Sequence, residues 1–141
     1  MVDGLLVRTV ALGPREASEV VGLGDVIRPW DACDLVWSVD WCAEWRVLVP
    51  ATLAALDRRF ADAIARYPTI AAQLLRRSAL RSQGLVHQAA IAQVRHASTR
   101  VLLALWHLAD RWGTVTRSGV RVPVPLTHQL VAQITCLQRP T

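Results

Sequence analysis

The sequence predicts an α+β protein, with a small antiparallel sheet in the first 50 residues and helices in most of the remainder. Two patterns predict this class. Before residue 50, short apolar and β-branched segments are separated by glycine and proline turns, which is typical of strands. After residue 50, apolar residues recur at spacings of three and four, which is typical of helices. The chain has 141 residues, 52% of them hydrophobic, which suits one ordinary domain or two small ones and excludes disorder as its main state.

Three segments of the first 50 residues have strand character. Residues 4 to 12 (GLLVRTVAL) are apolar and β-branched, and Gly13-Pro14 follows them as a turn signal. Val20-Val21 is a second short apolar segment, and residues 45 to 49 form a third. We therefore expect these segments to pair as a small antiparallel sheet.

Tryptophans also gather in this region. Trp37, Trp41 and Trp45 are spaced four apart, which indicates either an aromatic ligand pocket or a core of large side chains. We favour the core, because buried tryptophans usually serve packing.

The cysteines do not predict a metal centre. Cys33 and Cys42 fit a metal site on paper together with Asp34, Asp40 and Glu44, but the four histidines lie too far along the chain to complete it. The chain has three cysteines and no CxxC pair, which argues against a disulfide framework. We expect buried or idle thiols and no bound metal.

Two helices are predicted after the sheet. The pattern over residues 51 to 67 is helical, with Asp57 as a possible N-cap. Pro68 ends this segment and opens a long helix that runs to about Val94, a length of about 39 Å. Along it, positions 71, 75, 78, 82, 85, 89 and 92 form a narrow seam of small and apolar residues with the period of a coiled coil. The seam predicts a dimerisation helix, and packing on its own domain is the alternative.

Residues 100 to 112 form the clearest helix. Its apolar face is expected to contain Val101, Leu102, Leu105, Leu108, Ala109 and Trp112, with Arg100, His107 and Arg111 largely off that face. Gly113 is expected to end the helix. Residues 114 to 116 and 120 to 124 then read as a hairpin around Arg117-Ser118-Gly119.

A short helix follows the hairpin. Thr127 is expected to be its N-cap, and Leu130, Val131 and Ile134 are expected to be buried, before the helix ends near Cys136. The polar face, formed by His128, Gln129 and Gln133, contains no acid, so we expect nothing there to repel a phosphate.

Charge is divided unevenly along the chain. Residues 1 to 62 contain six arginines and ten acids, a net charge of −4, whereas residues 63 to 141 contain ten arginines and only Asp110, a net charge of +9. Such a cationic half usually faces phosphate, and an arginine-rich solvated surface is the alternative.

The predicted elements follow the order of a winged helix-turn-helix: a helix, a hairpin, a short helix, a tight turn and the start of a second helix. A helix start with Thr127, His128 and Gln129 can donate hydrogen bonds to phosphate oxygens. Arg139, at the opening of the second helix, has the planar fork that fits O6 and N7 of guanine. Double-stranded DNA is therefore the expected partner.

Residues 99 to 141 resemble the Crp/Fnr family of bacterial transcription regulators, the cyclic-AMP receptor and fumarate-nitrate regulator family. The match is to its LxxLWxLAxRWG, hairpin, PLTHxxLA and xRPT stretch. Weaker similarity covers residues 4 to 31 and 68 to 94. The resemblance implies a partial, cyclic-nucleotide-binding-like β-roll sensor over 1–67, a dimerisation helix over 68–94 and an incomplete winged helix-turn-helix over 95–141.

The resemblance also implies roles for single residues. Thr127, His128, Gln129, Gln138 and Thr141 would contact the DNA backbone, and Arg139 would read a base. Residues 51 to 56 would form a strand, with a helix from near Asp57. The expected partners are DNA and a second copy of the chain, with RNA polymerase a further one.

The expected sensor lacks the cyclic-nucleotide signature of the family. The segment GDVIRPWDACDL has no acid after its glycine and no Arg-Thr-Ala, so we expect weak or absent cyclic-AMP binding and assign no cofactor; the effector stays open. The match begins and ends inside family elements, so a second hypothesis is a truncated module that pairs with an intact regulator without binding DNA well.

Other classes are excluded by missing patterns. No run approaches 18 apolar residues and the first 25 positions carry six charges, so we expect a cytoplasmic protein without a membrane segment or signal peptide. No HExxH motif, phosphate loop or spaced nucleophile and base is present, so we expect no enzyme.

Overall fold

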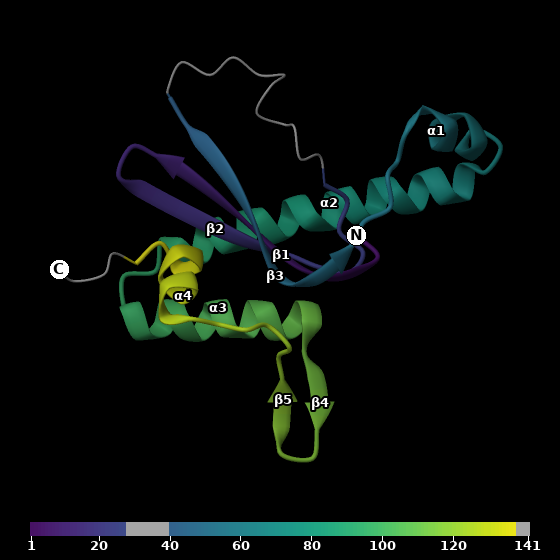
Figure 1. Ribbon diagram of the computed structural model, residues 1–141. Helices are drawn as coiled ribbons and strands as arrows, with labels where there is room; N and C mark the ends of the chain where they lie inside the picture. Colours follow the sequence, from purple (N-terminus) through teal and green to yellow (C-terminus); the bar gives the residue numbers. More distant parts are fainter. Residues whose placement is uncertain (28–39, 138–141) are drawn as a thin grey trace.

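The structure, a computed structural model, describes residues 1–27 and 40–137. It has the predicted α+β composition, with a three-stranded antiparallel sheet on one side of two long helices (Figure 1). A two-stranded hairpin projects from the end of the second long helix, and the last helix contacts both long helices and the sheet.

The sheet consists of β1 (Asp3–Leu12), β2 (Arg15–Val21) and β3 (Cys42–Thr52), in the order β2-β1-β3. All three predicted strand segments are confirmed, and each observed strand is longer than its apolar segment. The β1–β2 turn occurs at Gly13, whose φ of +57° is a left-handed conformation that glycine adopts easily.

The first helix starts where its N-cap predicts. Helix α1 (Arg58–Ile64) follows Asp57, whose side chain accepts a hydrogen bond from the Phe60 amide at 2.9 Å. The helical reading of residues 51 to 57 and the strand over 51 to 56 are both largely wrong, because β3 ends at Thr52 and residues 53–57 are irregular. Thr52 pairs with Asp3, the first residue of β1, so the chain beyond it has no strand to pair with.

The remaining elements lie close to their predicted positions. Helix α2 is Pro68–Ala92 and helix α3 is Ala97–Trp112, with Gly113 as its C-cap. Strands β4 (Thr114–Thr116) and β5 (Gly119–Arg121) form the hairpin, and α4 is His128–Thr135. Thr127 is the N-cap of α4, as predicted.

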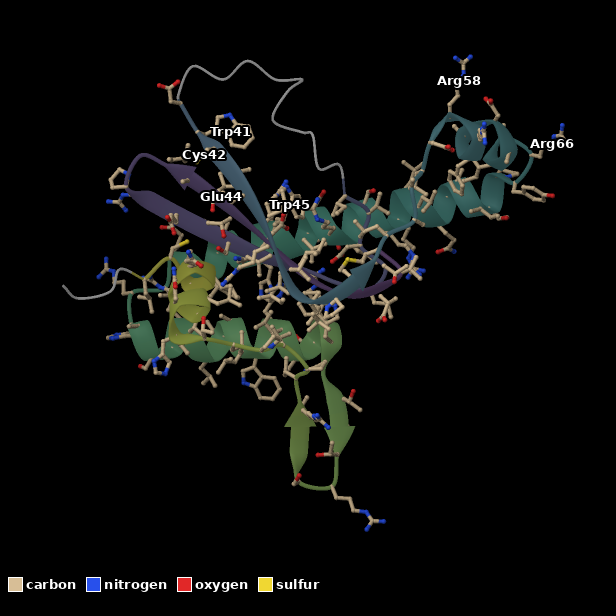
Figure 2. The ribbon with its side chains drawn as sticks, in the orientation of Figure 1. Trp41, Cys42, Glu44, Trp45, Arg58 and Arg66 are labelled. Atoms are coloured by element: carbon tan, nitrogen blue, oxygen red, sulfur yellow. The ribbon has the colours of Figure 1, made fainter. Side chains whose placement is uncertain are left out.

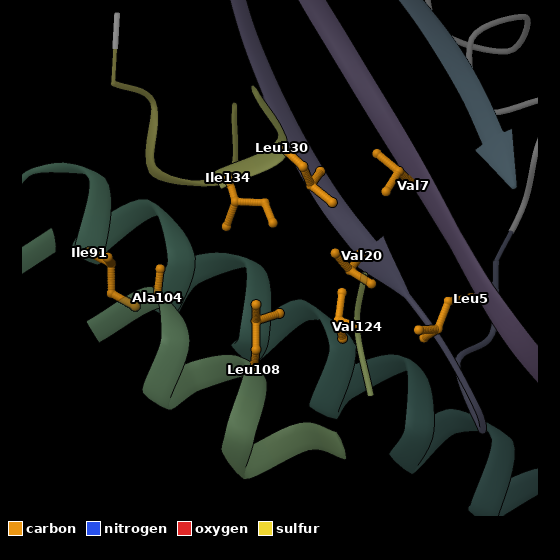
Figure 3. Packing of buried hydrophobic residues seen from close by; sticks show 9 residues of the cluster. All are labelled: Leu5, Val7, Val20, Ile91, Ala104, Leu108, Val124, Leu130 and Ile134. Atoms are coloured by element: carbon orange, nitrogen blue, oxygen red, sulfur yellow. The ribbon is translucent and has the colours of Figure 1, made fainter. Parts of the chain in front are cut away.

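One buried cluster joins these elements (Figure 3). It contains residues of β1, β2, α2, α3 and α4, together with Val124 from the segment before α4. Leu130 of α4 is fully buried, which fixes this short helix against the sheet and α3. Burying a leucine side chain contributes about 2 kcal/mol, so the cluster is the main anchor of α4.

The buried face of α3 differs from the prediction. Ala104, His107 and Leu108 are buried, whereas Leu102 is 54% exposed and Leu105 is 38% exposed. The small side chain of Ala104 packs in the same cluster as Ile91 of α2, which turns the Leu102 side of the helix outward. The prediction from hydrophobicity is wrong because two polar residues, His107 and Arg111, lie on the inner side of α3, where they form hydrogen bonds with other elements.

Candidate nucleic-acid interface

The start of α4 presents three of the predicted contact residues together. Thr127, His128 and Gln129 are all exposed, and the first turn of the helix contains no acid. The Leu130 amide donates to the Thr127 hydroxyl oxygen at 3.1 Å. That bond uses a lone pair of the oxygen, so the hydroxyl hydrogen stays available to donate to a phosphate oxygen.

The hairpin is held tightly against the end of α3. A Cβ placed on Gly113 would lie 2.3 Å from the Ala109 carbonyl oxygen and 2.6 Å from a methyl of Val120, so only glycine fits there. At the hairpin tip the Thr116 hydroxyl donates to the Gly119 carbonyl at 2.8 Å. Arg117 and Arg121 are both exposed on this hairpin and add positive charge to it.

A sharp turn ends α4. Cys136 has φ 52° and ψ 35°, a left-handed conformation. The Leu137 amide donates to the Ala132 carbonyl at 2.9 Å and the Cys136 amide to the Gln133 carbonyl at 3.4 Å, the paired bonds of a Schellman motif. The chain therefore turns as a glycine would turn it, although cysteine occupies the position. Gln138, Arg139 and Thr141 lie outside the described residues.

The charge near α4 is less uniform than predicted. The Gln133 amide donates to the Glu16 carboxylate at 2.7 Å, so an acid at the start of β2 lies beside this helix. The expectation of an acid-free polar face is wrong at Gln133, because a residue distant in sequence supplies the acid. Glu16 contacts the second turn of α4, and the predicted phosphate-facing residues belong to its start.

Several arginines of the cationic half face the protein itself. Arg81 is 2.5 Å from the Glu19 carboxylate, and Arg111 donates to both oxygens of Asp25 at 2.7 and 2.8 Å. Both acids are buried and lie on or just after β2. These guanidinium groups therefore fasten the two long helices to the sheet, and the net charge of this half overstates what it offers to phosphate.

Arg100 joins three elements through backbone oxygens. It donates to the Val94 carbonyl at 2.9 and 2.6 Å and to the carbonyls of Thr135 and Cys136 at 3.3 and 3.4 Å. It thus links the connection between α2 and α3 to the C-terminal end of α4. No sequence pattern predicts this role, since every residue type carries the same backbone carbonyl.

The exposed arginines of the cationic half are spread over the molecule. They are Arg66, Arg76, Arg77, Arg95, Arg117 and Arg121. Figure 2 places Arg66 beside α1, at the far end of α2 from α4. Arg95 follows Val94, which Arg100 ties to the end of α4. Among the residues that the structure describes, Arg95 is thus an exposed arginine beside the end of α4, whereas Arg117 and Arg121 lie on the hairpin that extends from the opposite end of α3 (Figure 1).

Two histidines meet where α2 and α3 pack together. His87 Nδ1 lies 3.1 Å from His107 Nδ1, and the rings are edge to face. Burial lowers the pKa of His107, the charges of Arg111 and His87 lower it further, and Asp110 acts in the opposite direction. No motif marked this pair in the sequence.

The structure tests part of the predictions for the tryptophans and for a metal site. Trp41, just before β3, and Trp45, on β3, are partly exposed and lie outside the buried cluster, so the core prediction is wrong for both (Figure 2). Arg8 lies over the Trp45 ring, with its guanidinium carbon 5.8 Å from the ring centroid, a cation–π contact. Trp37, Cys33 and Asp34 fall outside the described residues. Within those residues no group of three His, Cys, Asp or Glu side chains could hold a metal ion.

No protein-family model matches the chain, and no curated protein is significantly similar to it. In the described parts of the chain, no helix is both long and apolar enough to cross a membrane.

Proposed function

We propose that this protein is a cytoplasmic, DNA-binding transcription regulator of the Crp/Fnr type, with a β-roll-like sensor that does not respond to cyclic AMP. One observation carries the proposal. Helix α3, the β4–β5 hairpin and α4 follow one another directly, and the exposed start of α4 presents Thr127, His128 and Gln129 from a helix that is anchored by fully buried Leu130.

The proposed contacts divide into two kinds. Thr127, His128 and Gln129 would donate to phosphate oxygens and set the position of α4 on the duplex. Gln138 and Thr141 would add backbone contacts, and Arg139 would read a guanine edge. The exposed arginines of the hairpin, Arg117 and Arg121, would reach a neighbouring stretch of the DNA backbone.

The two sides of α2 support the proposed homodimer. One side faces the protein, where Arg81 binds Glu19 and Gln88 donates to the Ser18 carbonyl at 2.6 Å. The seam side is more open: Leu75 is 72% exposed, and Ser78, Ser82 and Ala89 are exposed as well. A second copy packing along this seam would cover apolar surface that the chain itself leaves in water.

The proposal is tested by selecting preferred duplexes from a randomised DNA pool and measuring binding by gel shift. Arg139→Ala should lower the preference for the selected duplex over a scrambled one by about 1 to 3 kcal/mol and leave the salt dependence mostly unchanged. His128→Ala, a phosphate contact, should weaken both duplexes alike. Equal preference in the native chain and in Arg139→Ala would show that another residue reads the base.

The open seam also favours a second candidate, an interaction module that pairs with an intact regulator. It predicts a dimer without selective DNA binding. Leu75→Glu, which places a charge in the seam, should weaken in sedimentation the dimer that both candidates predict, and selection from the DNA pool then separates the two. Dimerisation without any selected duplex supports the module, whereas a native monomer contradicts both forms of pairing.

A further inference from the structure

The packing of α2 on α3 includes one direct contact between two titratable side chains. His87 is exposed on α2, His107 is buried on α3, and their Nδ1 atoms lie 3.1 Å apart. Gly84, one turn before His87, faces the second ring: a Cβ there would lie 3.7 Å from His107 Cε1, an ordinary van der Waals contact. The two helices thus come together around the imidazole pair.

The state of protonation decides whether this contact is attractive. A hydrogen bond between two Nδ1 atoms needs a hydrogen on one and a lone pair on the other. A neutral pair meets this condition, and so does a pair in which only one ring is charged, since the charged ring donates to the neutral one. When both rings are charged, both Nδ1 atoms carry hydrogen, the bond is lost and two positive charges face each other.

We propose that the His87–His107 pair is a proton-controlled latch between the dimerisation helix and the DNA-binding segment, closed by one shared proton and opened by double protonation. The effect of the latch on DNA binding rests on the proposed function, whereas the latch itself is a property of the α2–α3 contact. It deepens that function by adding acidity as an input.

Most charged side chains around the histidine pair are engaged by other groups of the protein. From α3, Arg111 opposes a positive charge on the pair and Asp110 favours one. From α2, Arg81 is paired with Glu19 of β2, and Arg77 donates to the Gly24 carbonyl at 3.2 Å. From the turn after β2, Asp25 is engaged by Arg111. The acids nearest the pair, apart from Asp110, are therefore already neutralised, so they do little to stabilise a second proton.

Solvent can reach both rings without unfolding. His87 and His107 line a cavity of about 670 Å³ between the two helices and the turn after β2. The cavity is open, so a proton can bind to His107 in the folded chain. Protonation is then a switch of the native state rather than a step that occurs only after the protein unfolds.

The direction of the pH effect follows from the lowered pKa of His107. Below its ordinary value of 6.5, the unfolded chain takes up a proton that the folded chain resists. The contribution of this residue to stability is therefore complete above about pH 6.5 and is lost as the pH falls towards the folded-state pKa. Opening the contact would leave α3 less firmly held on α2, so two DNA-binding segments in a dimer would lose their fixed spacing.

The decisive experiment follows the ring Cε1–H signals of all four histidines by NMR between about pH 8 and pH 4.5, a range that spans ordinary imidazole titration. In the native chain the His107 midpoint should lie below the ordinary imidazole value of 6.5. His87→Gln keeps an amide beside His107 but carries no charge, so it should move the His107 midpoint upward and raise its protonated fraction near pH 6 several-fold. His96→Gln, which removes an exposed histidine elsewhere, should leave the midpoint in place.

His87→Ala provides a second test, since it removes the partner entirely from an exposed position and should also move the His107 midpoint upward. An unchanged His107 midpoint in both variants would overturn the latch.

DNA binding separates the two proposals. The affinity of the native chain for its selected duplex, relative to that of His87→Gln, should fall several-fold as the pH drops from about 7.5 to about 5. A shifted His107 midpoint with no DNA binding at any pH would support the latch and contradict the proposed function. A constant affinity ratio would show that the latch does not control DNA binding and would overturn its assigned output.

Discussion

The arginines of α3 and those of the β4–β5 hairpin are close in sequence and opposite in use. Arg100 and Arg111 point into the molecule, where they bind backbone carbonyls and the buried Asp25. Arg117 and Arg121, only a few residues further on, are exposed. Net charge therefore counts the cations of a segment, while the fold decides how many of them remain exposed to a partner.

Arg111→Met should have the largest effect on stability, because it leaves the buried Asp25 carboxylate without its cation. We expect a loss of about 3 kcal/mol in the free energy of unfolding, measured by urea denaturation. Asp25→Asn combined with Arg111→Met should lose much less than the sum of the two single changes. A loss below about 0.5 kcal/mol for Arg111→Met would mean that Asp25 is solvated in the native state.

Arg100→Met tests an inward arginine whose partners are neutral. Its four hydrogen bonds end on backbone oxygens, so we expect a loss of about 2 kcal/mol, smaller than for the charged pair. Amide hydrogen exchange should rise at the C-terminal end of α4. Exchange that rises only within α3 would contradict a role in joining the two helices.

Thr127→Ala tests the element that holds the proposed phosphate contacts. Losing the acceptor for the Leu130 amide should cost about 1 kcal/mol. Thr127→Ser keeps the hydroxyl and should retain almost all of the stability in the same urea titration. If both variants are equally unstable, the methyl group rather than the cap bond is responsible.

Arg117→Ala should have the smallest effect on stability, within about 0.5 kcal/mol, because its side chain is exposed. Its effect should appear in DNA binding instead, where the slope of log affinity against log salt falls by about one phosphate contact. Arg66→Ala, an exposed arginine near α1, is the matched control and should leave the slope unchanged. Equal slopes for the native chain and Arg117→Ala would show that Arg117 on the hairpin does not contact the DNA backbone.

Local signals predicted the elements well. The caps at Asp57 and Thr127, the proline that opens α2 and the glycine that ends α3 each act on neighbouring residues, and each helix boundary they mark is observed within a few residues. The turn after α4 is local as well, although its left-handed residue is a cysteine.

Contacts between distant segments were not predictable in the same way. The inner face of α3 includes His107 and Arg111 because their partners come from α2 and from the turn after β2. Glu16 lies beside α4 because the start of β2 reaches that helix. Residue type predicts which groups need partners, but only the fold determines where those partners are.

The shared cluster of buried residues has a consequence for how the molecule behaves as a whole. One buried cluster contains Val7 and Val20 of the sheet, Ile91 of α2 and Leu130 of α4. If one of these segments unfolds, the buried side chains of the others become exposed to water. We expect a single cooperative melting transition, with the same midpoint for tryptophan fluorescence and helical circular dichroism. Through this shared core, a substitution that destabilises the sheet would also destabilise α4, although no specific chain of contacts connects the two.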